Sequence, residues 1–115
     1  MYTTPTINAT DGYKIGHHNQ MPPEVFYQLN NFTPRKTRRK NVKKIMWFGL
    51  QFFTKKYIIE GFQKTFFDQP KAVAIAKYKR RIDNYLGVQP DSAYDHIADL
   101  HDLGYLPIKI KALKE

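Results

Sequence analysis

The sequence predicts an α+β domain in which three main helices and a short N-terminal helix pack on a small, incomplete β-sheet. Three segments carry apolar residues at helical spacing, while residues 25–32 and 106–113 have the composition or the alternation of strands. The chain has 115 residues, which indicates a single domain, 1–115. A composition that is 42% hydrophobic and 15% aromatic provides enough apolar surface for a core and excludes a disordered tail.

The N-terminal part begins with residues 1–9, a predicted loose lead-in to the short helix. Thr10 or Asp11 can cap this helix, because a side-chain oxygen there accepts a hydrogen bond from an otherwise unpaired backbone N–H. The Met-Pro-Pro sequence at 21–23 ends it, since proline has no N–H to donate. Residues 25–32 are rich in aromatic and β-branched residues and are therefore predicted to be a strand.

Residues 34–44 form a predicted solvent-exposed segment, here called the basic loop. Seven of the ten residues from Arg35 to Lys44 are Lys or Arg, and such closely spaced like charges repel one another unless anions lie between them. The formal net charge of the chain is +9, which favours anionic partners: nucleic acid, phosphorylated metabolites or an acidic protein.

Residues 45–60 are predicted to be helical after a short strand-like start. Apolar residues recur at spacings of four, three and four, which is one face of a helix. This face comprises Met46, Leu50, Phe53 and Tyr57. Phe48, Phe52 and Ile59 add a second apolar flank, and a helix that is apolar on most sides is usually buried in a core or an interface. Gly61 is predicted to end this helix.

Two further helices, residues 70–86 and 91–103, each follow a proline at their start and precede a glycine. Their predicted inward faces are Ile75, Tyr78, Ile82 and Tyr85 in the first, and Ala93, Ile97 and Leu100 in the second. Residues 106–113 alternate between apolar and lysine side chains, as a half-buried strand does. Such a strand needs a partner, or it leaves an unpaired edge.

Two groups of residues are candidates for ligand binding. Tyr13 offers an aromatic face to a ring, and Asp11 can accept from an amide; the alternative is a capping aspartate beside a packed tyrosine. Arg35 presents a planar fork that can hold a phosphate; the alternative is an exposed charged loop or a nucleic-acid surface. The aromatic residues that follow the cations have helix-core spacing, which disfavours a stacking platform for bases.

The sequence excludes several other functions. The chain has no cysteine, so it contains no disulfide, no thiolate nucleophile and no cysteine metal site, which fits a cytoplasmic protein. His96 and Asp99 share a helical face, but two ligands do not complete a metal site, and a solvated acidic face is the alternative. No metal site, signal peptide, membrane span or glycine-rich phosphate loop is predicted. No catalytic residue is assigned.

Five ordered segments resemble nicotinamide phosphoribosyltransferases. They are residues 9–14 (ATDGYK), 20–23 (QMPP), 32–36 (FTPRK), 47–53 (WFGLQFF) and 104–112 (GYLPIKIKA). The first two resemble the opening of these enzymes, the third the segment after their first strand, the fourth the next helix and the fifth a returning strand. The order and spacing agree from about residue 8 to the end. The chain thus resembles the N-terminal domain of a type II phosphoribosyltransferase.

This resemblance implies an enzyme that transfers phosphoribosyl from 5-phosphoribosyl-1-pyrophosphate, with Mg²⁺, to nicotinamide, giving nicotinamide mononucleotide and pyrophosphate in NAD salvage. It further implies a homodimer with active sites at the subunit interface. The family's aspartate and tyrosine near nicotinamide fall on Asp11 and Tyr13, with the tyrosine stacked on the ring. Its phosphate-contacting arginine falls on Arg35.

Members of the family are several times longer, and their catalytic residues come after the part that this chain resembles. We therefore expect the chain to be inactive alone, either as a fragment or as one part of an assembly with the catalytic portion. Two alternatives stay open: a free-standing binding or regulatory module, and a small basic nucleic-acid-binding protein.

Overall fold

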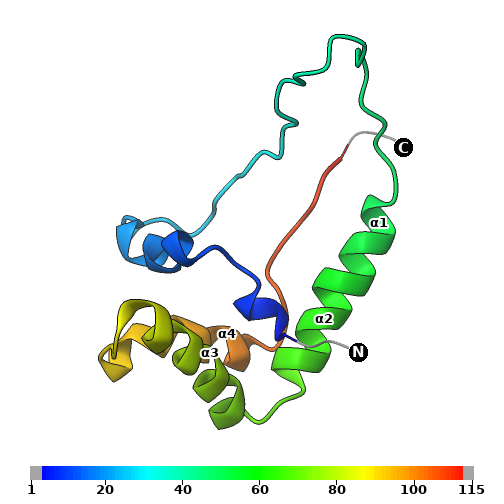
Figure 1. Cartoon of the computed structure of the whole chain (residues 1–115). Helices are drawn as coiled ribbons and strands as arrows, with labels where there is room; N and C mark the ends of the chain where they lie inside the picture. The colour runs from blue at the N-terminus through cyan, green and yellow to red at the C-terminus, as the bar shows by residue number, and fades with distance from the viewer. Residues whose placement is uncertain (1–3, 113–115) are drawn as a thin grey trace.

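A computed structural model describes residues 4–112, and within them the chain forms nine helical segments and no β-strand. The predicted α+β class is therefore wrong for the described part of the chain, which is all-helical (Figure 1). A long helix lies on one side, a pair of helices lies beside its C-terminal end, and a long irregular loop spans the top (Figure 1).

The N-terminal region contains two 3₁₀ helices, η1 (Thr6–Asn8) and η2 (Gly12–Gln20). η2 corresponds to the predicted short helix and ends before the two prolines. Asp11 occupies the N-cap position of η2, but its side chain makes no capping hydrogen bond. η1 lies within the predicted lead-in and buries Asn8.

The long helix consists of four consecutive elements: α1 (Leu50–Phe53), η3 (Thr54–Ile59), α2 (Glu60–Phe62) and η4 (Gln63–Phe67). η3 and η4 are π-helical. Gly61 does not end this helix as predicted but lies buried inside it. A Cβ at this position would approach Thr6 Oγ1 to 2.5 Å, so the missing side chain leaves room for η1. The N–H of Thr6 also donates to Thr65 Oγ1 at 3.0 Å, which fixes η1 on the helix.

α3 (Lys71–Leu86) and the pair η5 (Asp91–Tyr94) and α4 (Asp95–Leu103) confirm the two predicted C-terminal helices. Gly87 and Gly104 follow them with φ of 82° and 80°, the left-handed region that favours glycine. The core lies between these helices, η2 and the end of the long helix. Its buried residues are Ile15, Phe66, Ala74, Tyr78, Ile82, Tyr94 and Ile97. Tyr85, predicted to face inward, is exposed.

Neither predicted strand forms. Residues 25–32 belong to an exposed irregular segment, and residues 106–112 leave α4 as an extended trace (Figure 1); residue 113 lies outside the described part. A strand requires a neighbouring backbone, and neither segment has one within residues 4–112. The N–H of Ile108 instead donates locally to the carbonyl of Leu106 at 2.9 Å.

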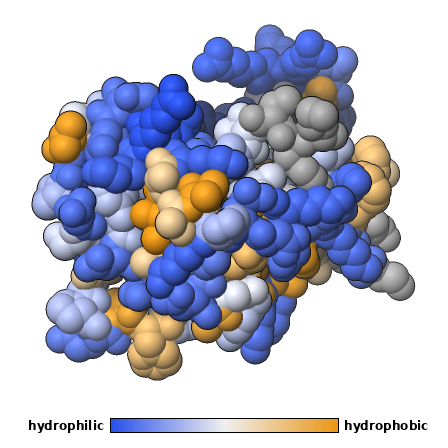
Figure 2. All heavy atoms as spheres, turned by 90° about the horizontal axis from the view of Figure 1, so that it is seen from below, coloured by the Kyte–Doolittle hydropathy of each residue, from blue (hydrophilic) through white to orange (hydrophobic). Residues whose placement is uncertain are grey.

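The apolar helix that the sequence predicts to be buried in a core or an interface is mostly not covered within the described chain, so a core position is wrong for it and an interface stays a prediction. Phe52 is 66% exposed, and Phe53, Tyr57 and Ile59 are exposed as well. Only the C-terminal end of this helix, where Phe66 is located, reaches the core. The face of the molecule seen from below is mostly hydrophilic, with apolar side chains in separate small groups (Figure 2).

Candidate functional site

Asp11, Tyr13 and Lys14 lie together at the start of η2 and form a cluster that we call the Tyr13 patch. Lys14 Nζ lies 2.9 Å from Oδ2 of Asp11 and 5.4 Å from the centroid of the Tyr13 ring. Tyr13 is 69% exposed, and the ring of His17 lies edge-on to it at 6.2 Å. The patch thus combines an accessible aromatic ring with an adjacent charge pair.

The ion pair sets the charges in the Tyr13 patch. The hydrogen bond from Lys14, followed by the charge of that lysine, lowers the pKa of Asp11. The same hydrogen bond and the charge of Asp11 raise the pKa of Lys14. Both groups are therefore ionised near neutral pH. The carboxylate retains lone pairs beyond those used by Lys14 and can accept an N–H from an amide ligand.

The face of η2 opposite the Tyr13 patch packs against α3 and α4. Side chains three residues apart share a face of a 3₁₀ helix, which places Gly12, Ile15 and His18 together. Ile15 is buried, and the rings of His18 and His96 stack at 3.8 Å. A Cβ on Gly12 would overlap the ring of Tyr85, so η2 approaches α3 closely at this point. Because this face is packed, the Tyr13 patch is directed outward.

Arg35 lies in the basic loop, where residues 31–46 are all exposed. Among the described residues, its side chain makes no ion pair and no hydrogen bond. No contact joins it to Asp11 or Tyr13, so the structure of this chain alone does not bring the three predicted site residues together. A ring contact of 5.6 Å between Phe32 and Trp47 links the two ends of this region.

Sequence reasoning missed a groove of about 540 Å³ between η1, η2 and α3. Its cations are Lys77, Arg80 and Arg81. Their spacing of three and four residues was the available signal, because it places all three on one side of a helix. The contribution of Asn8 was not visible, since η1 is distant from α3 in the sequence.

The histidines and carboxylates give no metal site within the described residues, because no three of them cluster closely enough to hold an ion. His96 packs on His18 instead, and burial followed by the nearby His18 lowers the pKa of His96. Among the helices formed by residues 4–112, none has the length and apolar character needed to cross a membrane.

Comparison with known proteins identifies the family of the chain. The family described as "Nicotinamide phosphoribosyltransferase, N-terminal domain" matches residues 6–110. A relative from Acinetobacter baylyi, named nicotinamide phosphoribosyltransferase, is 47% identical over 114 residues. That match covers 95% of this chain but only 22% of the relative. No solved structure matches the chain significantly.

Proposed function

Because the chain belongs to the family of nicotinamide phosphoribosyltransferase N-terminal domains, we propose that it is the N-terminal part of an enzyme that makes nicotinamide mononucleotide. The complete enzyme would transfer phosphoribosyl from 5-phosphoribosyl-1-pyrophosphate to nicotinamide in NAD salvage. This part would present Asp11, Tyr13 and Arg35 across a homodimer interface and would be inactive alone.

The outward-facing ring of Tyr13 carries this proposal. A planar heteroaromatic ligand can stack on an exposed tyrosine, and the neighbouring carboxylate of Asp11 can accept a hydrogen bond from a carboxamide N–H. The packed face of η2 holds both groups on a folded element, which limits their motion when a ligand arrives.

Arg35 would act on the second substrate. Its guanidinium is exposed and unpaired within the described residues, so it can form a bidentate interaction with a phosphate without first breaking an ion pair. In the complete enzyme these residues would contribute position and charge: the ring is held by Tyr13 and the phosphates by Arg35 while positive charge develops on the ribose. Mg²⁺ would enter with the diphosphate of this substrate.

The test is an assay for nicotinamide mononucleotide with the purified chain, alone and mixed with the part of the Acinetobacter baylyi enzyme that follows the aligned segment. We expect no turnover by the chain alone and turnover in the mixture. The positive control is the same mixture with the aligned N-terminal segment of the relative in place of this chain. Turnover by the lone chain would contradict its expected inactivity. Failure of the mixture while the control succeeds would contradict the proposed role.

A further inference from the structure

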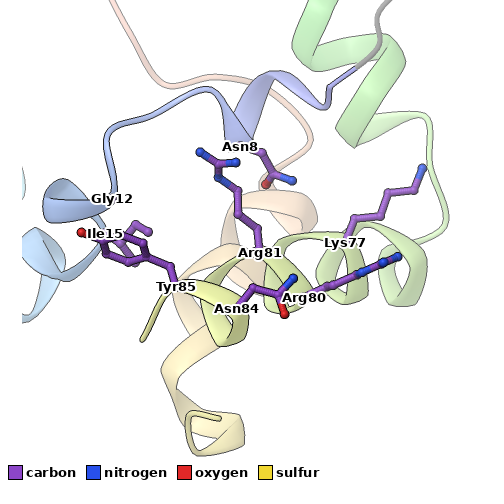
Figure 3. Close-up of a pocket in the computed structure, with 8 residues that line it drawn as sticks. All are labelled: Asn8, Gly12, Ile15, Lys77, Arg80, Arg81, Asn84 and Tyr85. Atoms are coloured by element: carbon purple, nitrogen blue, oxygen red, sulfur yellow. The ribbon is translucent and has the colours of Figure 1, made fainter. Parts of the chain in front are cut away.

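The groove between η1 and α3 is a concave surface that lies beside the proposed substrate contacts. Asn8 lies on one side of it, and Lys77, Arg80, Arg81 and Tyr85 project from α3 (Figure 3). Neither Tyr13 nor Arg35 lines it. Its volume of about 540 Å³ lies in the range of cavities that accept small metabolites.

Three positive charges on α3 meet at this groove without a carboxylate to balance them. Lys77, Arg80 and Arg81 form no ion pair with any described residue. By contrast, Lys79 on the same helix pairs with Asp83 at 3.1 Å. Arg81 donates only to the backbone carbonyl of Thr10, at 3.3 Å. Like charges at helical spacings of three and four repel one another, so a bound anion would relieve this repulsion.

Asn8 adds a second, independent indication of a ligand. It is 7% exposed, and its Oδ1 has no hydrogen-bond donor within the described structure. Buried polar atoms are normally paired, and an unpaired one needs an explanation. Figure 3 shows the Asn8 side chain at the groove, with Arg81 reaching toward it. The terminal torsion of asparagine is broad, so the amide oxygen can turn to meet a donor in the groove.

Two adjoining hollows share this residue. One, of about 520 Å³, joins Asn8 to Arg81 and to the ion pair of Lys14 with Asp11, and the other, of about 460 Å³, joins it to Arg80 and to Lys64, which pairs with Glu60. The unbalanced positive charge is therefore concentrated in the groove itself, on Lys77, Arg80 and Arg81. Such a surface accommodates a ligand that is anionic at one end and carries hydrogen-bond donors close by.

We propose that this groove binds a phosphate monoester that carries hydroxyl groups, a sugar phosphate in chemical class. Arg80, Arg81 and Lys77 hold the phosphate oxygens, because guanidinium and ammonium groups form charge-assisted hydrogen bonds with them. A ligand hydroxyl donates to Asn8 Oδ1, which satisfies the unpaired acceptor. The exposed ring of Tyr85 covers the carbon skeleton.

The test is calorimetric titration of the purified chain with ribose 5-phosphate and, separately, with inorganic phosphate. We expect saturable binding of both, tighter for ribose 5-phosphate because only it fills the hydroxyl position. Loss of a charged hydrogen bond in Arg81→Gln should weaken binding about tenfold. Asn8→Asp, which places a carboxylate in the groove, should weaken it at least as much.

Three controls separate this site from other cationic surfaces. Arg39→Gln removes the same charge from the basic loop and should leave the affinity unchanged, as should Arg35→Ala and Tyr13→Ala. Equal weakening by Arg39→Gln would show unspecific attraction, and loss in Arg35→Ala would move the ligand to the proposed substrate site; either overturns the proposal. So does the absence of saturable binding.

A measurement on the unaltered chain guards against variants that fail to fold. In a ¹⁵N correlation spectrum, addition of ribose 5-phosphate should shift the side-chain amide of Asn8 and the guanidinium signal of Arg81. Shifts confined to residues 34–44 would contradict the assignment.

Discussion

Phe66 offers the strongest test of the fold that supports the Tyr13 patch. It is the largest side chain that is fully buried, at 0% exposure, and it joins the long helix to α4. Its ring lies 5.0 Å from that of Phe67, 6.4 Å from Phe62 and 5.2 Å from His101. Phe66→Ala removes these contacts together and leaves a cavity between the two helices.

The expected loss follows from the two parts of this change. Burial of a phenylalanine side chain contributes about 1.5–3 kcal/mol, and the cavity raises the total cost to about 3–5 kcal/mol. A domain of this class has a free energy of unfolding of roughly 5–15 kcal/mol, so the variant should be close to unfolding. Urea denaturation followed by circular dichroism measures the difference.

Phe52→Ala is the matched control, because it makes the same chemical change on the same helix at a residue that is 66% exposed. Its free energy of unfolding should change by no more than about 0.5 kcal/mol. If Phe66→Ala cost less than about 1 kcal/mol, or if the two variants lost the same amount, the packing described here would be wrong.

Three further predictions concern two tyrosines and the cations of the basic loop. Burial, followed by the hydrogen bond to Asp83, raises the pKa of Tyr94 to about 12. The folded state therefore retains a proton that the unfolded chain loses near pH 10, so the free energy of unfolding should fall as the pH rises from about 10 to 12. Urea titrations at several pH values measure this fall, which Tyr94→Phe should reduce. Tyr13→Ala should leave the melting temperature unchanged, because the ring is exposed, but should lower turnover of the reconstituted mixture at least ~10-fold, as expected for loss of a stacking contact of at least ~1.4 kcal/mol; full turnover would remove Tyr13 from the site. Replacement by glutamine of Arg38, Arg39, Lys43 and Lys44 should leave stability within about 0.5 kcal/mol, because these residues are exposed. Salt-sensitive binding of single-stranded DNA that disappears in this last variant would instead support the nucleic-acid alternative.

The sequence predicted the two C-terminal helices well because local signals determined them. Pro70 precedes α3 and Gly87 follows it with a positive φ, while Tyr78 and Ile82 repeat at the helical spacing and are both buried. These are properties of neighbouring residues, so they can be recognised without knowledge of the rest of the fold.

Gly61 shows where local signals were insufficient. A glycine that follows an apolar helical pattern is typical of a helix end, but here it lies at the contact with η1, where Thr6 would meet a side chain. That contact spans more than fifty residues of sequence. The groove was missed for the same reason, because Asn8 and the cations of α3 come together only in the folded chain.

The predicted strands failed for a different reason, which also bears on the proposed function. Residues 106–112 have the alternating sequence of a strand, yet all but Leu106 are exposed and no described segment pairs with them. The exposed aromatic face of residues 50–59 likewise has no cover within residues 4–112. An unpaired extended segment and a large apolar surface both favour association with further polypeptide. The chain aligns with only 22% of the length of its relative. The reconstitution assay supplies the rest of such an enzyme as the polypeptide that could cover these surfaces. If that part binds, the exposed fraction of these aromatic residues should decrease, and hydrogen exchange in residues 106–112 should slow as their backbone N–H groups find acceptors.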